Sequence, residues 1–149
     1  MPWVAFDTNG ALVTEHRDKG HPVYFGDASR HEILHHAGVG SARAFVVTLG
    51  SAEATERMVT EIMKLRPKAC VLARAKDGEH AARLAKFGAT DAIPEAIEAS
   101  LQLAGRLMEH LDFPEDVADR RIAEVRNLEV VAVRRAAKQA SKAAKPEAS

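Results

Sequence analysis

Short apolar segments alternate with stretches of helical periodicity over the first two thirds of the chain, and this alternation constrains the fold more than any other feature. Each apolar segment is rich in β-forming residues and stops at a polar residue, glycine or proline. Strands joined to helices through short turns imply a parallel sheet with right-handed crossovers. The predicted class is therefore α/β, with strands at residues 3–6, 23–25, 44–49, 69–73 and 89–93.

Residues 23–34 form the central stretch of this pattern. An apolar run reaches Gly26 and Asp27, and a helical pattern begins at Ser29, with Glu32 placed as a capping partner. In a parallel sheet such a turn lies at the carboxyl end of a strand, where ligands bind. Gly26 would let the backbone come close to a ligand. The Asp27 carboxylate would accept hydrogen bonds from hydroxyl or amino groups of that ligand. The alternative is that Asp27 only bonds its own backbone in an Asx turn.

The last third of the chain is predicted to be helical. Residues 95–111 carry an apolar stripe, residues 112–114 break the pattern, and residues 115–145 form one more helical segment. The Ala/Lys-rich end of that segment has few apolar residues for packing. The division predicted is a sheet domain at 1–94, a crossover and dimerisation helix at 95–112, and a helical tail at 113–149. The stripe consists of Ile97, Leu101, Ala104 and Met108.

Composition excludes several classes of protein. The 149 residues suffice for one domain, and 21 basic residues balance 21 acidic ones, which argues against a dedicated nucleic-acid binder. No apolar run reaches the roughly 18 residues that a membrane span needs. The single cysteine, Cys70, excludes an internal disulfide, fits a reducing cytoplasm and is predicted to be buried in a strand.

Residues 31–35 match the zinc signature H-E-x-x-H, which places two histidines one helical turn apart around a glutamate base. A hydrolase would need a third ligand, and no clear motif for one follows in the sequence. The favoured interpretation is a solvated helix edge at His35 and His36. His21 and His80 show no partner pattern and are predicted to lie on the surface.

Several local motifs together carry a family resemblance. They are Asp7 at the end of the first apolar run, the Gly26-Asp27-Ala28-Ser29 turn, Val46-Val47-Thr48, Ala73-Arg74-Ala75 and Ile93-Pro94-Glu95. This succession resembles the regulator-of-potassium-conductance (RCK) domain, also called the TrkA N-terminal domain, and in particular the form fused to Kef-type potassium efflux antiporters. The resemblance covers roughly residues 3–111.

The resemblance implies a Rossmann-like regulatory domain that is not an enzyme. It would bind NAD(H), AMP or ATP, without a metal, at the cytoplasmic face of an antiporter or channel, and it would act as a homodimer. Asp7 would hold the ribose, and Gly26, Asp27 and Ala28 would line the adenine side. Thr48 and Gly50 would lie near the phosphates. Arg74 would lie near the ligand and the subunit contact.

One departure from the family pattern is large. A Rossmann domain opens with a strand and a G-x-G-x-x-G turn that cradles the pyrophosphate, and the sequence contains no such motif. The missing strand would lie between the strand that ends at Asp7 and the one that ends at Thr48. The two flanking strands could pair directly, a second copy could supply a strand, or the chain could be a fragment, which is the favoured interpretation. Nucleotide affinity is expected to be weak in every case.

Other functions stay open from the sequence. The chain could be a fragment of an NAD-dependent oxidoreductase or a stand-alone interaction domain that no longer binds nucleotide. Asp7 could be a plain turn residue and Arg74 a surface arginine. The basic end from Arg134 could contact anionic lipid or nucleic acid, although a solvated helix end is the favoured interpretation.

Overall fold

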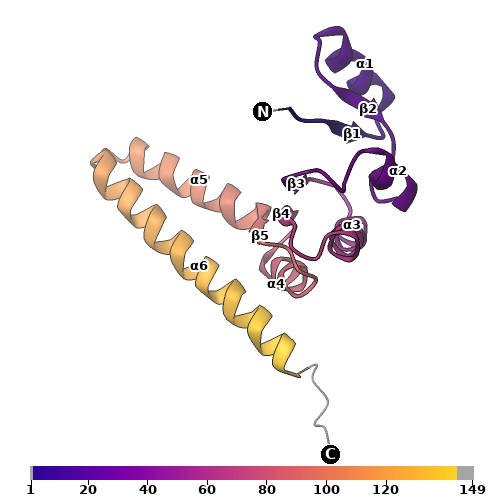
Figure 1. The fold of residues 1–149 in the computed structure, drawn as a ribbon. Coiled ribbons are helices and arrows are strands. Elements are labelled where there is room, and N and C mark those ends of the chain that lie inside the picture. The colour runs from indigo at the N-terminus through magenta and orange to yellow at the C-terminus, as the bar shows by residue number, and fades with distance from the viewer. Residues whose placement is uncertain (1, 144–149) are drawn as a thin grey trace, which may run out of the picture.

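The computed structural model describes residues 2–143, and it consists of strands and helices in alternation followed by two long helices (Figure 1). The predictions for residues 144–149 lie outside the described residues. The elements are β1 (Ala5–Asp7), α1 (Gly10–Asp18), β2 (Val23–Phe25), α2 (His31–His36), β3 (Ala44–Val47), α3 (Ala52–Leu65), β4 (Cys70–Ala75), α4 (Gly78–Lys86), β5 (Asp91–Pro94), α5 (Glu95–His110) and α6 (Glu115–Ala143).

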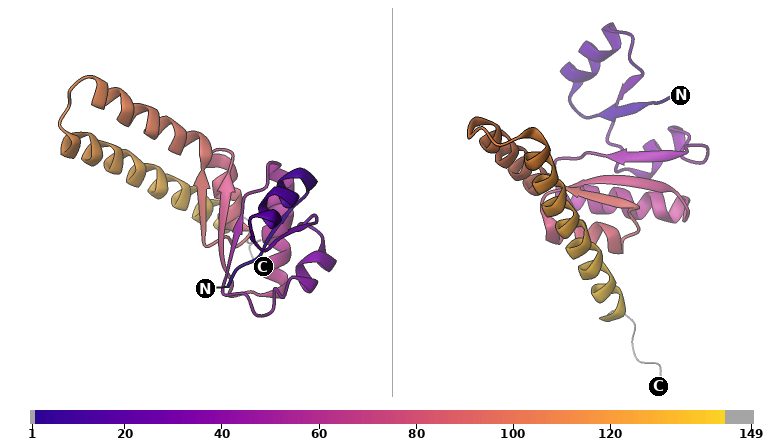
Figure 2. Two further views of the ribbon diagram at one scale, coloured as in Figure 1. Left: turned by 90° about the horizontal axis from the view of Figure 1, so that it is seen from above. Right: turned by 90° about the vertical axis from the view of Figure 1, so that its left-hand side faces the viewer.

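The strands form two parallel sheets rather than one. β1 pairs with β2, in a register that sets Ala5 opposite Val23. β4 lies between β3 and β5, with Val46 opposite Leu72 and Arg74 opposite Ile93. Figures 1 and 2 show the spatial order β2, β1, β3, β4, β5. The α/β prediction is confirmed, but β1 and β3 do not pair directly within the described residues.

One hydrophobic core holds the two sheets together through helices. α3 and α4 cover one face of β3–β4–β5, and the centre of the core is formed by Val59, Ile62, Val71 and Leu84. Ala28 and Leu34, from the segment after β2, belong to the same cluster. The β1–β2 half is therefore joined to the rest by side-chain packing, although no strand ladder connects them.

The sequence also predicts helix caps at Ser51 and Asp77, and both are confirmed. The Ser51 hydroxyl accepts a hydrogen bond from the Ala54 amide at 3.2 Å, and the Asp77 carboxylate accepts one from the His80 amide at 2.8 Å. The cap predicted at Ser29 is wrong. Ser29 donates its hydroxyl to Asp27, and α2 begins after Arg30 without a side-chain cap. The Asp27 carboxylate, two residues earlier in the chain, binds the Ser29 hydroxyl, so this hydroxyl does not cap the helix.

Two predictions of inward-facing residues are also wrong. Cys70 is exposed, because β4 alternates between buried and exposed residues instead of being covered on both faces. The helical spacing of Ala81, Leu84 and Phe87 predicts that all three face inward, but Phe87 is the C-cap of α4 and is exposed. The Cys70 error comes from assuming that helices cover both faces of this sheet.

The last two helices form an antiparallel hairpin, and α6 returns to pack against α4 (Figure 1). Leu101 on α5 is buried, and the Arg126 guanidinium on α6 donates three hydrogen bonds to Glu98 on α5. Val133 still packs against the core, and α6 continues to Ala143. Part of the stripe predicted for dimerisation is thus used inside the chain. Over residues 2–143, no helix combines the length and apolarity needed to cross a bilayer.

Candidate functional site

The residues predicted to form the site lie at the carboxyl ends of four parallel strands. Asp7 is the last residue of β1, and Gly26, Asp27 and Ala28 directly follow β2. Thr48 and Gly50 follow β3, and Arg74 is the next-to-last residue of β4. In open parallel α/β sheets, ligands bind in the crevice outside the carboxyl ends of the strands.

Asp27 organises the turn after β2. Its Oδ1 accepts hydrogen bonds from the Ser29 amide at 2.9 Å and from the Ser29 hydroxyl at 2.7 Å. These two bonds hold the pKa of the Asp27 carboxyl below its ordinary value, so the group is ionised at neutral pH. The structural role considered for Asp27 is confirmed, and the same carboxylate offers an acceptor to a ligand.

Replacing Ser29 with alanine is expected to raise the pKa of Asp27 toward its ordinary value, because both the hydroxyl donor and the shape of the turn change. A carboxyl group whose pKa is lower in the folded than in the unfolded state stabilises the fold at pH values above its unfolded-state pKa. That stability is lost as the pH falls through its folded-state pKa. The wild-type chain should therefore lose this contribution below about pH 4, and the variant should show a smaller loss. An NMR titration of the Asp27 carboxyl measures the shift, and an unchanged pKa in the variant would contradict the assignment.

The other positions around this turn have contacts of their own. Asp7 Oδ1 accepts the Asn9 amide at 2.7 Å, which is the turn role considered for it. A Cβ atom placed on Gly26 would meet Ile33 and Phe6 at ordinary contact distances, so packing does not require glycine there. Ala28 is buried and belongs to the hydrophobic core.

Arg74 is held at the end of the other sheet. Its Nη2 donates to the Thr48 carbonyl at 2.8 Å, and its Nε lies 3.6 Å from a Glu95 carboxylate oxygen. Arg74 and Gly50 line one cavity of about 340 Å³ together with Lys76 and His80. Arg74 therefore bonds Thr48 and shares a cavity with Gly50, and that cavity contains the cationic side chain of Lys76 and the carboxylate of Glu95 beside Arg74.

His80 is predicted to lie on the surface but is buried in the structure. It is only 2% exposed, so the surface prediction is wrong. Its Nδ1 accepts the Lys76 amide at 3.0 Å, while its buried Nε2 has no hydrogen-bond partner and lies 3.7 Å from Glu56. The available signal was the helical spacing, because His80 lies one turn before Leu84 on the buried face of α4.

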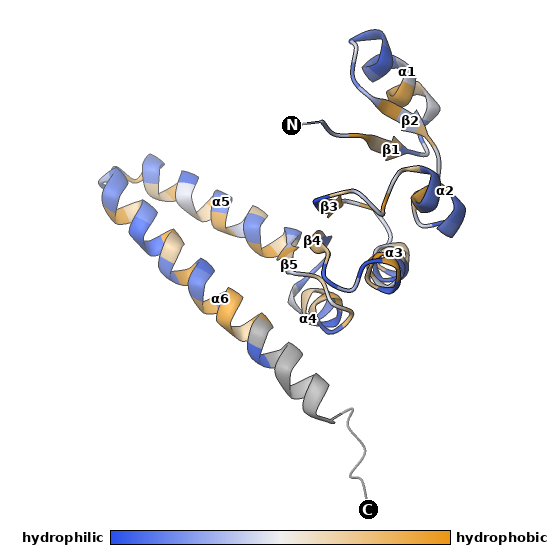
Figure 3. Cartoon of the chain, viewed as in Figure 1, coloured by the Kyte–Doolittle hydropathy of each residue, from blue (hydrophilic) through white to orange (hydrophobic). Residues whose placement is uncertain are grey.

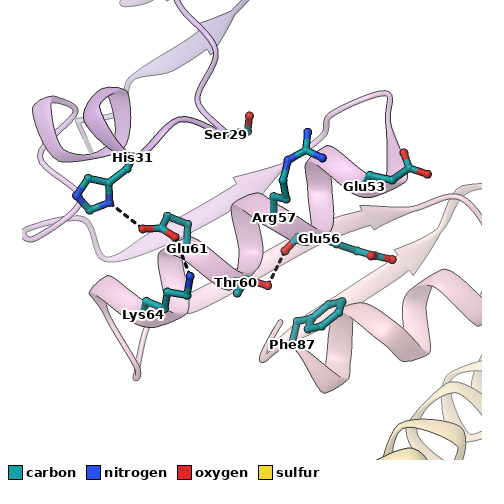
Figure 4. Close-up of a pocket in the computed structure, with 9 residues that line it drawn as sticks. All are labelled: Ser29, His31, Glu53, Glu56, Arg57, Thr60, Glu61, Lys64 and Phe87. Carbon is teal, nitrogen blue, oxygen red and sulfur yellow. Dashed lines mark hydrogen bonds and ion pairs between the residues drawn. The ribbon is translucent and has the colours of Figure 1, made fainter.

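A second cavity, of about 570 Å³, lies between the turn after β2 and helix α3 (Figure 4). Figure 4 shows Arg57 extending toward Ser29, and the positive charge of Arg57 helps to lower the pKa of Asp27. His31 Nδ1 lies 2.7 Å from Glu61, whose pKa is lowered by His31 and by Lys64. This pair links α2 to α3 across the cavity.

The side chains of the H-E-x-x-H motif are not arranged as a metal site in the described part of the chain. Within residues 2–143, no three His, Cys, Asp or Glu side chains gather closely enough to hold a metal ion. His35 and His36 are exposed, as predicted. His31 is engaged by a glutamate on another helix instead of facing a shared metal position.

The family is decided by a match over most of the strand-and-helix region: the sequence model of the TrkA-N domain matches residues 1–95. The chain belongs to the TrkA-N domain family. A curated relative is the chloroplastic K(+) efflux antiporter 1 of Arabidopsis thaliana, 41% identical over 114 residues, which is 76% of this chain and 10% of the antiporter. The TrkA-N chain thus spans about a tenth of the length of that relative.

Solved structures show the same fold. The Kef C-terminal domain of Shewanella denitrificans in its AMP-bound form matches with a TM-score of 0.74 and 19% identity, over 91% of this chain and 98% of that one. The GsuK channel bound to NAD matches with a TM-score of 0.62 and 20% identity, over 69% of this chain and 19% of that one. The Rossmann-like prediction and the Kef-type resemblance are both confirmed.

Proposed function

We propose that this TrkA-N chain is the nucleotide-binding regulatory part of a potassium efflux antiporter or channel, that it lies at the cytoplasmic face of the membrane, and that it has no catalytic role. The observation that carries the proposal is the TrkA-N match together with 41% identity to a K(+) efflux antiporter. The AMP-bound and NAD-bound neighbours support a nucleotide as the effector. A ligand that changes the packing of two domains would bias transport through its differential affinity for their arrangements.

The proposed nucleotide lies across the carboxyl ends of both sheets. Asp7 and Asp27 supply carboxylate acceptors for ribose hydroxyls and the adenine amine, with Gly26 and Ala28 contributing backbone. Thr48, Gly50 and Arg74 lie on the phosphate side, where the guanidinium of Arg74 is already oriented by the Thr48 carbonyl. Carboxylates at one end and cations at the other match the polarity of a nucleoside monophosphate.

Replacing Arg74 with alanine is expected to weaken AMP binding about ten- to a hundredfold, since a charge-assisted hydrogen bond to phosphate contributes about 1.5–3 kcal/mol. Isothermal titration calorimetry with AMP measures the change, and adenosine should show none because it carries no phosphate. The matched control is Arg106→Ala, which removes the same charge from an exposed arginine that bonds Glu109 on α5. Equal AMP affinity in the two variants would contradict the assignment of Arg74.

The proposed dimer uses the outward side of the α5–α6 hairpin. Hydrophobic residues recur along both helices (Figure 3), and those that stay exposed include Leu103 and Leu107 on α5, Leu111 at its C-cap and Leu128 on α6. This stripe lies on the face of α5 opposite the buried Leu101. Sedimentation of the chain and of Leu107→Glu tests the proposal, with a dimer expected only for the unsubstituted chain.

A further inference from the structure

The His80 side chain holds the loop that joins β4 to α4. Its Nδ1 accepts a hydrogen bond from the Lys76 amide at 3.0 Å, and the His80 amide donates to the Asp77 carboxylate at 2.8 Å. Lys76 is the first residue beyond the strand, since the pairing of β4 with β5 ends at Ala75 and Pro94. The His80 ring therefore fixes the path of the backbone where it leaves the sheet.

The bond to Lys76 also fixes the position of the ring proton. A backbone amide can only donate, so Nδ1 must offer its lone pair, and the proton of the neutral ring lies on Nε2. That Nε2 is buried and has no hydrogen-bond partner among the described residues. Oε1 of Glu56 on α3 lies 3.7 Å from it, beyond hydrogen-bond distance. The neutral ring thus satisfies the loop and leaves its own donor unused.

A second proton on the ring would reverse these preferences. Protonation places a hydrogen on Nδ1, where it opposes the Lys76 amide, and it strengthens the attraction of Nε2–H to the Glu56 carboxylate. The Arg83 guanidinium already holds the same Glu56 oxygen at 2.8 Å, so this carboxylate is oriented before the ring titrates. His80 therefore has two competing partners, the loop when it is neutral and α3 when it is charged.

The charged groups around the ring come from α3, β4, α4, α5 and the loop. The carboxylates are Glu53 and Glu56 on α3, Asp77 at the start of α4 and Glu95 on α5, and the cations are Arg74 on β4, Lys76 in the loop and Arg83 on α4. Among the described residues, only Glu56 lies within ion-pair distance of a ring nitrogen. Glu56 is therefore the group that receives the charged ring.

The loop that His80 holds forms part of the wall of the cavity proposed for the phosphate side of the nucleotide. His80 itself lines this cavity of about 340 Å³, together with Lys76, Arg74 and Gly50. We propose that neutral His80 positions the loop after β4 for nucleotide binding, and that protonation of His80 releases the loop and weakens this binding. The inference rests on the proposed function, from which the ligand of the cavity is taken.

The charge that His80 gains does not replace the bond that the loop loses. Glu56 compensates the new positive charge from the side of α3, whereas Lys76 loses the acceptor that orders its backbone. Histidine is the side chain that ordinarily changes charge between about pH 5 and 8. The nucleotide affinity is therefore expected to decrease as the pH falls through this range.

An NMR titration of the full chain without nucleotide tests the control of the loop. From about pH 8 to about pH 5, the Lys76 amide resonance should move together with the titration of the His80 ring. In His80→Asn it should stay in place, because the asparagine Oδ1 replaces Nδ1 as the acceptor and does not titrate. A Lys76 amide that does not move while the unsubstituted His80 ring titrates would overturn the proposal, as would a ring that does not titrate in this range.

AMP titrations at about pH 8 and about pH 5.5 test the coupling to binding. The AMP phosphate also gains a proton in this range, and comparison with His80→Asn removes that contribution because it is common to both chains. The two chains should bind AMP equally at the higher pH. At the lower pH the affinity of the unsubstituted chain should fall about fivefold more, which is the scale of one backbone hydrogen bond.

His110→Asn is the matched control for these titrations. It removes an exposed imidazole from the end of α5, away from the cavity, and should respond to pH as the unsubstituted chain does. Loss of the pH response in this control would overturn the assignment to His80.

The remaining outcomes separate the control of the loop from the nucleotide function. Equal decreases in affinity for the unsubstituted chain and His80→Asn would overturn the proposal. A smaller decrease in the unsubstituted chain would also overturn it, because charged His80 would then attract the phosphate. Coupled titration of Lys76 and His80 in a chain that binds no AMP would support the control of the loop and contradict the proposed nucleotide function.

Discussion

Replacing Ile62 with alanine is expected to lower the free energy of unfolding by about 2–5 kcal/mol, the largest single-residue effect we predict for the core. Ile62 is fully buried on α3, in the cluster that also contains Leu34 from α2, Val71 from β4 and Leu84 from α4. Truncation would leave a cavity whose walls are anchored in four different elements. Such a site relaxes poorly, because each wall is fixed by its own secondary structure.

Urea denaturation monitored by circular dichroism measures this change, and the matched control is Val46→Ala. Val46 is 69% exposed on β3, so its truncation should alter the free energy of unfolding by less than about 1 kcal/mol. A loss of similar size in the two variants would contradict the assignment of the core to the α2–α3–α4 layer. A small loss at Ile62 alone would mean that this layer packs loosely.

Replacing Gly88 with alanine is the second large effect, with an expected loss of about 1–3 kcal/mol from backbone strain alone. Gly88 ends α4 with a φ of +105°, which L residues rarely adopt. A Cβ atom there would also lie 2.9 Å from Cγ of Met63, closer than carbon atoms pack. Thermal unfolding of the variant should show both contributions together.

Two further variants separate strain from overlap at Gly88. In a Met63→Ala background the overlap disappears, so the penalty of Gly88→Ala should fall but stay above zero because the φ angle is unchanged. Gly50→Ala is the matched control, since a Cβ at Gly50 meets no atom within 4 Å. A penalty that vanishes completely in the Met63→Ala background would refute the strain argument.

Local signals predicted the elements well because each is decided within a few residues. The caps at Ser51 and Asp77 and the positive-φ ends at Gly20 and Gly38 depend only on neighbouring backbone. The failures involve competition or tertiary context. Ser29 caps no helix because Asp27 takes its hydroxyl, and Cys70 is exposed because one face of its sheet carries no helix in the described residues.

The predicted ends of the strands located part of the candidate site. All seven predicted positions lie at or directly after the carboxyl end of a strand, and Arg74 bonds the Thr48 carbonyl and shares a cavity with Gly50. The predicted site left out His80 and Lys76, because a single histidine among the apolar residues of α4 and a lysine in the loop after β4 carry no motif. The pattern also could not show how far the β1–β2 half stays joined to the core, which depends on packing through Ala28 and Leu34.

The central claim is that both sheets contribute to one nucleotide site, and intermolecular NOEs between AMP and the chain test it most directly. At millimolar AMP we expect NOEs from the base and ribose to the backbone of residues 26–28, together with phosphate-induced amide shifts at residues 48–50. The Arg74 side chain should shift in the same titration. NOEs confined to one sheet, or shifts confined to α5 and α6, would contradict the claim.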